Sequence, residues 1–251
     1  MNSDKVQQVF GERAATYVNS ASHTDQEVLA RVRGLCGELD GRKVLDVATG
    51  TGHTALFLAP YAGKVIGLDL TPQMLRLAQN ASEEKGIENT EWVRGDVNAL
   101  PFPDASFDVV CSRRAPHHFP DLDRALREMA RVLKAGGVMV IDDRSVPDHE
   151  GVDWTMNLLD GLHDRSHVRE YNAREWRGAL SRAGLNVREK QEYSRHLPLS
   201  SLTSNADKDD AARIENLVAN LPIELKQLMG IEMVEGVTYI DHYFISIKAT
   251  K

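Results

Sequence analysis

The chain has 251 residues, of which 42% are hydrophobic and 27% are charged, as is typical of a folded globular protein rather than a disordered or fibrous one. Its formal net charge is −7, so no overall positive field concentrates nucleic acid or anionic lipid on its surface. We therefore expect no nucleic-acid partner. Without a long apolar run or a signal-peptide pattern, we also expect no membrane partner and a cytoplasmic location. Cys36 and Cys111 lie in apolar stretches and are expected to be buried, reduced thiols.

Strand-like and helix-like segments alternate over the first part of the chain. A helix is expected after His23 and Thr24, with Thr24 as a natural N-cap. Later helices are expected after the cap Thr71 and from Leu122, the latter closed by glycines at 136–137. Apolar, β-branched runs predict strands at 43–48, 65–70, 91–94, 107–112 and 138–143. This alternation favours a parallel sheet.

The last hundred residues, roughly, are less regular. Asn172 and Glu175 form a capping-box pattern that predicts a helix ending near Gly184. Strands are expected at 185–193 and at 237–249, with helical stretches at 207–220 and 222–230 between them. We interpret the intervening segment as an insertion that shapes a pocket or forms a dimer contact. Trp154, Met156 and Leu158 are candidates for an apolar pocket wall, although packing in the core explains them equally well.

A glycine-rich turn follows the first predicted strand, within residues 46–55 (DVATGTGHTA). Gly50 and Gly52 lack Cβ atoms, so the backbone can turn sharply and approach a ligand at the carboxyl end of the strand. Residues 50–55 also match G-x-G-x-x-[GA], a pattern that nicotinamide-binding proteins share. On its own, the turn predicts either a nucleotide-type ligand or merely a tight connection between a strand and a helix.

Three acidic residues lie at the ends of three successive predicted strands. Asp69 ends the second strand, where a carboxylate can accept hydrogen bonds from both hydroxyls of a ribose. Asp46 precedes the glycines, and its negative charge would repel a pyrophosphate but attract an ammonium group. Asp96 follows the third strand and could accept a hydrogen bond from an adenine amino group. Together these positions favour a cationic ligand that contains adenosine.

This combination resembles the class I methyltransferases that depend on S-adenosylmethionine (SAM), specifically the UbiE-like or type 11 branch. The resemblance rests on VLDVATGTG (44–52), GLDLTPQML (67–75), GDVNALPFPDASFDVV (95–110), HHFPD (117–121) and EMARVLKAGGVMVIDD (128–143). It implies an α/β fold: a single Rossmann-like domain with a mostly parallel, seven-stranded sheet, an antiparallel last strand, N-terminal lid helices and a helical insertion before that strand. The expected parts are the N-terminal lid and helices (1–40), the nucleotide-binding core (41–193), the insertion (194–236) and the terminal strand (237–251).

The resemblance also implies SAM as cofactor, S-adenosylhomocysteine as product and no metal. Asp46 and the backbone of Gly50 and Gly52 are expected to hold the methionine part, Asp69 the ribose, and Asp96 with Val97 the adenine. The family's first glycine is Ala48 here, from which we expect a slightly tighter turn without lost binding. The expected cofactor-binding residues are Asp46, Ala48, Gly50, Gly52, Asp69, Leu70, Asp96, Val97 and Tyr17.

Residues 10–17 look like the helix that folds over SAM in similar proteins, with Tyr17 near the methionine end. An equally good interpretation is that Phe10 and Tyr17 only anchor the N-terminal segment through apolar contacts.

Candidate catalytic residues lie in the loop after the fourth strand. His117 or His118 could accept a proton, and Arg113 or Arg114 could hold an anionic acceptor. The alternative is that the histidines only brace this loop. The stretch 163–170, rich in histidine and charge, either lines the acceptor pocket or forms ion pairs at a solvated helix end. His53 is expected to start a helix.

Three functions remain open at this point. The leading prediction is methyl transfer from SAM to a small-molecule acceptor with an O, N or C nucleophile, by in-line displacement. The alternatives are a nicotinamide-dependent oxidoreductase, against which Asp46 and Asp96 argue, and a SAM-binding protein without catalysis. A homodimer is compatible with the sequence, which names neither the acceptor nor the atom that is methylated.

Overall fold

The computed structural model of the protein describes residues 23–251, which form an α/β fold around an eight-stranded sheet. Its strands are β1 (Lys43–Val47), β2 (Lys64–Asp69), β3 (Thr90–Arg94), β4 (Phe107–Arg113), β5 (Leu133–Ser145), β6 (Asn186–Pro198), β7 (Glu232–Val234) and β8 (Val237–Thr250). The main path runs β3-β2-β1-β4-β5-β8-β6, and β7 pairs with β8. The first five strands are parallel, whereas β8 is antiparallel to both its neighbours on that path. The mostly parallel sheet with an antiparallel last strand is thus confirmed, and the short β7 adds a strand that was not predicted.

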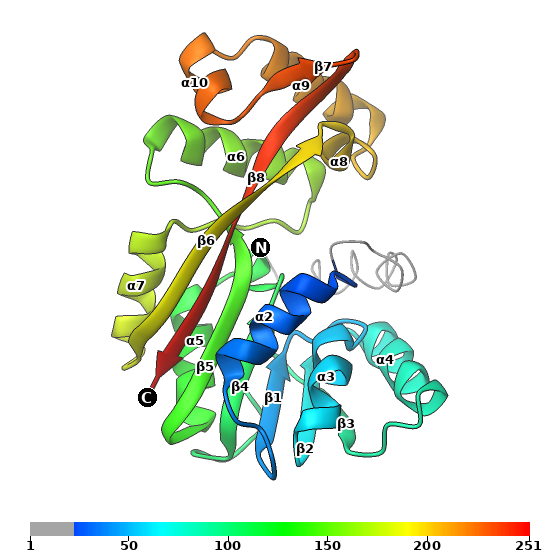
Figure 1. Ribbon diagram of the computed structural model, residues 1–251, viewed down its shortest axis with the longest axis vertical. Coiled ribbons are helices and arrows are strands. Elements are labelled where there is room, and N and C mark those ends of the chain that lie inside the picture. The colour runs from blue at the N-terminus through cyan, green and yellow to red at the C-terminus, as the bar shows by residue number, and fades with distance from the viewer. Residues whose placement is uncertain (1–22) are drawn as a thin grey trace.

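Helices flank and extend this sheet (Figure 1). They are α2 (Gln26–Cys36), α3 (His53–Leu58), α4 (Pro72–Glu84), α5 (Leu122–Val132), α6 (Glu150–His163), α7 (Ala173–Arg182), α8 (Ser200–Thr203), α9 (Lys208–Ala219) and α10 (Ile223–Leu228). The capping box at the start of α7 is present as predicted, with both of its hydrogen bonds between Asn172 and Glu175. The expected cap of α2 was wrong by one residue, because the side chain of Asp25 accepts the amide hydrogen bonds there. Within residues 23–251, no helix is long and apolar enough to span a bilayer.

The expectation that glycines close α5 was also wrong. Helix α5 ends at Val132, and β5 begins directly at Leu133 and includes both glycines. Gly136 has a φ of +73°, and a Cβ at Gly137 would lie 2.7 Å from the Leu133 side chain. The glycines therefore let the first residues of β5 bend over the buried Leu133, rather than stopping a helix.

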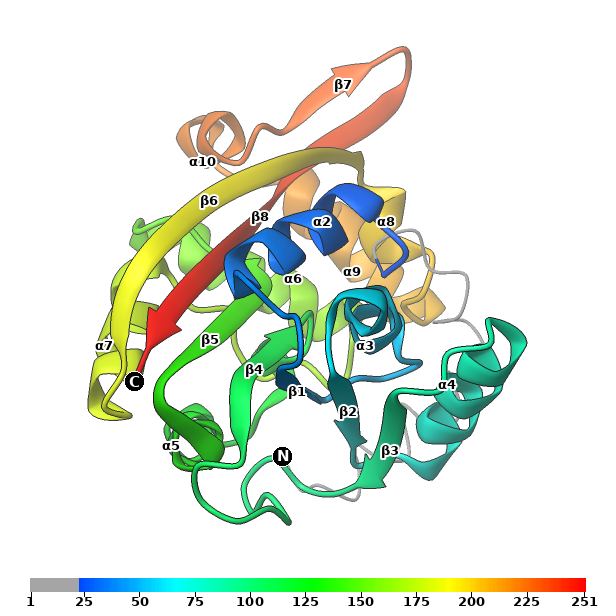
Figure 2. The same ribbon diagram turned by 60° about the horizontal axis from the view of Figure 1, so that its bottom comes forward.

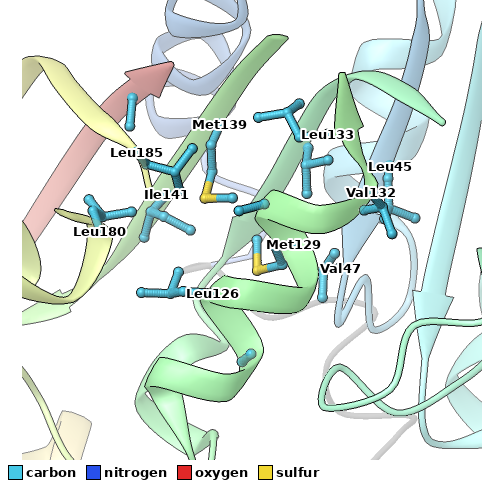
Figure 3. Packing of buried hydrophobic residues seen from close by; sticks show 14 of the residues in the cluster. Leu45, Val47, Leu126, Met129, Val132, Leu133, Met139, Ile141, Leu180 and Leu185 are labelled. Carbon is cyan, nitrogen blue, oxygen red and sulfur yellow. The ribbon is translucent and has the colours of Figure 1, made fainter. Parts of the chain in front are cut away.

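Two hydrophobic clusters cover the two faces of the sheet. The first cluster packs α5 and α7 against side chains of β1, β4 and β5, as Figure 3 shows for Leu126 and Met129 beside Met139. The second cluster packs α2 and α3 on the opposite face, through residues such as Val32 and Leu58. In β1, Val44 belongs to the second cluster, and Leu45 and Val47 belong to the first, as the period of a strand requires. The sheet is thereby fixed from both sides.

A third hydrophobic cluster lies beyond the sheet's covered faces. Strands β6 and β8 continue past the other strands into a region that contains α6, α8, α9 and α10 (Figures 1 and 2). Its core includes Met156 and Leu159 from α6, Leu202 from α8, Ile214 from α9 and Ile240 from β8. This arrangement places α6 and the 194–236 segment above the carboxyl ends of the parallel strands, where the functional site lies.

Candidate active site

A cavity of about 830 Å³ opens at the carboxyl ends of β1, β2, β4 and β5, with β3 contributing through the loop that follows it. Strand ends and their loops supply one side, and α6, α8 and β8 supply the other. The predicted site residues that line it are Asp46, Ala48, Gly50, Asp69, Leu70, Asp96, Val97, Arg113, His117 and His118. Gly52 does not line it, and Tyr17 and the expected N-terminal lid lie outside the described residues. The structure therefore brings nearly all the described candidates together.

The glycine-rich turn has a left-handed backbone at three positions, with φ of +55° at Ala48, +56° at Gly50 and +83° at Gly52. A Cβ at Gly50 would meet open space, so the backbone there is accessible from the cavity. A Cβ at Gly52 would lie 2.7 Å from the Trp92 ring, so this glycine is needed for close packing between the turn and β3. His53 starts α3, as predicted, and lines the cavity.

Asp69 is held at the end of β2 by backbone amides. Its Oδ2 accepts a hydrogen bond from Gly50 N at 2.8 Å, and its Oδ1 accepts one from Thr71 N, also at 2.8 Å. Burial raises the pKa of Asp69, and these amide hydrogen bonds act in the opposite direction. An ionised carboxylate has about four acceptor sites, so each oxygen keeps capacity for a further donor. Such a carboxylate suits two neighbouring hydroxyls of a ligand.

Asp46 is a buried carboxylate, 2% exposed, at the end of β1. Its Oδ2 accepts hydrogen bonds from Thr49 Oγ1 at 2.6 Å and from Ala55 N at 3.2 Å, and Cys111 Sγ lies 3.6 Å from its Oδ1. Burial raises the pKa of Asp46 to about 6, because the protein supplies too little positive charge to offset the loss of water. The site therefore fits a ligand with a positively charged group.

Asp96 follows β3 and is tied to the next residues of its loop. Its Oδ1 accepts hydrogen bonds from Asn98 N at 2.8 Å and from Asn98 Nδ2 at 3.0 Å. Asn98 also lines the cavity, although no motif in the sequence singled it out. Val97 lies between them and packs against the first hydrophobic cluster. The loop thus offers a polar edge beside an apolar side chain.

His117 and Asp143 form a buried pair on the cavity wall. His117 Nδ1 lies 2.6 Å from Asp143 Oδ1, and the backbone N–H of His117 donates to Asp143 Oδ2 at 2.7 Å. Burial raises the pKa of Asp143 to about 7, and burial together with the neighbouring His118 lowers the pKa of His117. At neutral pH and above, His117 is therefore a neutral imidazole whose Nδ1–H donates to Asp143, which leaves Nε2 as a proton acceptor. Within residues 23–251, Nε2 has no hydrogen-bond partner.

The other residues of this loop are engaged with the surrounding chain. Arg113 Nε donates to Thr54 Oγ1 at 2.9 Å, and its Nη2 donates to the His23 carbonyl at 2.7 Å. Arg114 Nη2 donates to Tyr193 Oη at 2.9 Å, and its guanidinium lies 3.7 Å from the centre of the Phe244 ring. The main role visible for Arg113 and Arg114 is thus to join the strand ends to neighbouring elements.

The stretch from His163 to Glu170 divides between the cavity and the surface. His163, Asp164 and His167 line the cavity, whereas Arg165 is exposed and pairs with Asp207. His118 Nδ1 donates to the Ser166 carbonyl at 3.1 Å, so this stretch packs against the loop after β4. Part of the stretch therefore lines the cavity and part forms an ion pair at the surface, whereas its contact with an acceptor stays a prediction.

Several cavity residues were missed by the sequence analysis, and one expectation failed. The missed residues line the cavity and come from four different elements: Arg144, Asp160, Ser201 and His242. Only Arg144, directly after a predicted strand, carried a positional signal that could have identified it. The candidate apolar wall is absent: Trp154, Met156 and Leu158 do not line the cavity. Met156 belongs to the third hydrophobic cluster, and Trp154 is 62% exposed.

The chain is similar in sequence to known methyltransferases. Residues 45–141 match the family described as methyltransferase domain. The uncharacterized methyltransferase YcgJ of Bacillus subtilis is 41% identical over 152 residues, which are 61% of this chain and 60% of that protein. The ubiquinone/menaquinone biosynthesis C-methyltransferase UbiE of a Shewanella species is 41% identical over 118 residues, 45% of this chain and 47% of that protein. The chain thus spans less than two thirds of these curated relatives.

Solved structures extend the similarity to most of the chain. The crystal structure of B. subtilis YcgJ has a TM-score of 0.85 and 31% identity, covering 90% of this chain and 98% of that one. A putative methyltransferase from Bacillus halodurans has a TM-score of 0.86 and 31% identity, covering 90% and 99%. The fold and the cavity at the strand ends define a Rossmann-like nucleotide-binding enzyme. The chain belongs to the class I SAM-dependent methyltransferases, in their UbiE-like branch, and the cofactor of this family is SAM.

Proposed function

We propose that the protein transfers the methyl group of SAM to a small-molecule acceptor. The observation that carries this proposal is that one cavity combines two kinds of site. Buried carboxylates at the ends of β1 and β2, Asp46 and Asp69, line one part, and the His117–Asp143 pair borders another. We call the part lined by Asp46, Gly50, Asp69 and Asp96 the cofactor half, and the part lined by His117, His118, Arg144 and His163 the acceptor half.

The residues of the cofactor half fit SAM. The buried Asp46, whose pKa is raised by burial, suits the positive groups at the methionine end. Asp69 keeps acceptor capacity for the two ribose hydroxyls, and Asp96 with Val97 offers a polar edge and an apolar face to the adenine. When bound, SAM supplies a methyl group on a positively charged sulfur, which a nucleophile can displace in line. The chain has to hold both molecules in line and exclude water.

In the acceptor half, His117 is proposed to take the proton of the acceptor. Asp143 fixes the ring and its tautomer, so that Nε2 presents a lone pair. The acceptor is an O, N or C nucleophile that carries a proton to lose. His118 is proposed to brace the loop, since its Nδ1 is used by the Ser166 carbonyl. Arg113 is proposed to position the turn, through its hydrogen bonds to Thr54 and His23.

The proposal is tested first by ligand binding and turnover. SAM and S-adenosylhomocysteine should raise the melting temperature of the purified protein, whereas NAD should not. Methyl-labelled SAM incubated with the protein and fractionated small-molecule extracts should label an acceptor. Binding of NAD in place of SAM would overturn the proposal in favour of an oxidoreductase, which the family membership does not favour. Binding of SAM without any labelled product would instead indicate a SAM-binding protein that lacks catalysis.

A second experiment tests the role of His117. His117→Ala should lower turnover about 10²- to 10⁴-fold, the usual contribution of a positioned acid or base. The affinity for S-adenosylhomocysteine should stay unchanged in calorimetry. His149→Ala is a matched control, because His149 caps α6 and does not line the cavity. Turnover equal to that of the unmodified protein would indicate that His117 only braces the loop.

We further propose a cytoplasmic protein that works as one domain over its four expected parts. The free, buried state of Cys36 and Cys111 supports a reducing compartment. Ser201 and Asn205 of the 194–236 insertion line the cavity, which supports a role of this segment in shaping the acceptor pocket. A homodimer remains a prediction, which light scattering after size exclusion would test.

A further inference from the structure

The acceptor half contains a partly buried arginine, Arg144, with one edge that makes no hydrogen bond to residues 23–251. Arg144 Nε donates to Glu170 Oε1, and its Nη2 donates to both oxygens of Asp160 at 2.7 Å and to His242 Nδ1 at 3.1 Å. Nη1 is the remaining nitrogen, and within residues 23–251 it has no hydrogen-bond partner. The side chain is 17% exposed and lines the cavity. We infer that Nη1, with its two N–H groups, is the edge that faces the cavity.

The hydroxyl of Ser201 is a second donor, because the tautomer of the neighbouring His242 is fixed. A guanidinium can only donate, so His242 Nδ1 accepts from Arg144 and the imidazole proton is on Nε2. Burial, and then the charge of Arg144, lower the pKa of His242 to about 3, so the ring is neutral. Nε2–H donates to Ser201 Oγ at 3.0 Å, which makes the hydroxyl oxygen an acceptor and leaves its proton available. Ser201 lines the cavity, and no other acceptor for this proton is found within residues 23–251.

The two carboxylates that accept hydrogen bonds from Arg144 differ in their pKa shifts. Burial and the negative charge of Asp160 raise the pKa of Glu170, which favours its protonated form. Asp160, whose two oxygens both accept from Arg144 Nη2, is then the main partner of the guanidinium charge. Asp164, the other carboxylate in this half, accepts hydrogen bonds from the backbone N–H and the hydroxyl of Ser166.

We propose that Arg144 and Ser201 bind a carboxylate carried by the methyl acceptor, so that the substrate is a small carboxylic acid. Arg144 on β5 and Ser201 on α8 each offer a donor to the same cavity, and the guanidinium adds charge to its hydrogen bonds with a carboxylate. Phe119, Leu197 and Phe244 line the same cavity and offer apolar contact to the rest of such a molecule. This inference rests on the proposed methyl transfer and narrows its substrate class. Arg144 and Ser201 are then residues that determine specificity, while His117 acts on the reacting atom.

The test uses benzoate as the probe, with benzamide as its uncharged isostere, on the full chain saturated with S-adenosylhomocysteine. Calorimetry should show saturable binding of benzoate that is at least about tenfold tighter than that of benzamide, because the amide carries no negative charge to pair with the guanidinium. Equal affinities, or no saturable binding of benzoate, would overturn the carboxylate proposal. Failure of S-adenosylhomocysteine to bind in the preceding titration would instead contradict the proposed function, so the two failures are distinguishable.

The variant for this test is Ser201→Ala, because replacement of Arg144 leaves Asp160 uncompensated and endangers the fold. Ser201→Ala should weaken benzoate binding about 3- to 10-fold, the usual effect of one hydrogen bond to a charged group, and should weaken benzamide binding less, because the amide oxygen is uncharged. Ser204→Ala is the matched control, since Ser204 is exposed, does not line the cavity and donates to the Ser200 carbonyl. Unchanged benzoate binding in Ser201→Ala, with S-adenosylhomocysteine affinity intact, would refute the role of this hydroxyl.

Discussion

The geometry of Asp69 indicates which ligand groups its carboxylate can bind. Two backbone amides, from the turn after β1 and from the residue before α4, fix one hydrogen bond on each carboxylate oxygen. The carboxylate therefore cannot rotate freely, and its remaining acceptor sites keep a constant direction. One oxygen is thus available to each of two adjacent hydroxyls of a ligand. This preorganisation predicts a large effect on substitution.

Asp69→Ala should weaken SAM binding by more than tenfold, since two hydrogen bonds to a charged acceptor are lost. Isothermal titration calorimetry measures the change. Asp69→Asn keeps one carbonyl oxygen and should lose less affinity than Asp69→Ala. Asp104→Ala is a control at a carboxylate that is 78% exposed and far from the cavity lining, and it should bind SAM normally. An unchanged affinity in Asp69→Ala would refute the ribose assignment.

Asp143 acts on the proposed base through one hydrogen bond, and an isosteric change can reverse that bond. In Asp143→Asn, the amide oxygen can still accept from the His117 backbone N–H, which places the amide nitrogen against His117 Nδ1. An amide NH₂ only donates, so Nδ1 must become the acceptor and the imidazole proton moves to Nε2. Nε2 can then no longer accept a proton from the substrate.

Turnover of Asp143→Asn should therefore fall to nearly the level of His117→Ala, with unchanged S-adenosylhomocysteine affinity. The pH profile adds a readout that a purely structural role would not move. In the unmodified enzyme, kcat should decline as pH falls through about 7, where the buried pair takes up a proton. In Asp143→Asn, the residual activity should lose this dependence. A variant with full turnover would show that the tautomer of His117 does not matter.

Among the helices and strands, the best predicted are those whose sequence signals come from residues adjacent in the chain. The capping box before α7 and the strands β1, β2 and β4 rest on residues adjacent in the chain, and the structure has them close to the predicted ranges. Helix α6 was not predicted, because the exposed Trp154 lies among the buried Val152, Met156 and Leu159 and hides the helical spacing. Strand β7 has three exposed residues and exists through its pairing with β8. Such pairing leaves no recognisable pattern in the sequence of the short strand itself.

The capping box gives a prediction at this scale. Asn172→Ala removes the side-chain oxygen that accepts from Glu175 N at 2.9 Å, so α7 should lose about 1 kcal/mol of stability. Urea unfolding should show a lower midpoint with an unchanged slope. Asn172→Asp retains the acceptor and should stay close to the unmodified protein. Because Asn172 does not line the cavity, SAM affinity should not change. A loss in Asn172→Asp as large as in Asn172→Ala would contradict the capping account.

At the scale of the whole molecule, the two halves of the cavity differed in how far the sequence predicted them. Parallel strands end at one edge of a sheet, so acids at successive strand ends, such as Asp46 and Asp69, could be placed together from their positions alone. Arg144, Asp160, Ser201 and His242 are brought together by the third hydrophobic cluster, which joins α6, α8 and β8. Their proximity depends on packing between segments far apart in the chain, and no spacing in the sequence encodes it.

The buried charge of Asp46 in the cofactor half lowers the stability of the whole fold, and this loss of stability can be measured. Its pKa in the folded protein, about 6, lies above the usual 3.8, so folding favours the protonated carboxyl. The contribution of Asp46 to stability is thus fully present below pH about 4 and is lost as pH rises through about 6. At pH 7.5 the ionised group destabilises the SAM-free protein by about 3 kcal/mol, since raising a pKa by one on folding corresponds to about 1.4 kcal/mol.

Asp46→Asn should therefore be more stable than the unmodified protein at pH 7.5 without ligand, by up to about 3 kcal/mol, and equally stable at pH 4. The amide can keep the hydrogen bonds from Thr49 and Ala55 on its oxygen and turn its NH₂ toward Cys111 Sγ. SAM should stabilise this variant far less than it stabilises the unmodified protein, because the attraction to its positive groups is gone. Urea unfolding of each protein at pH 4 and at pH 7.5, with and without SAM, gives the four free energies of unfolding that are compared.

Asp40→Asn, at an exposed acid before β1, is the control and should show neither effect. If Asp46→Asn were no more stable than the unmodified protein at pH 7.5, or bound SAM as tightly, the buried charge would not be the group that attracts the cofactor.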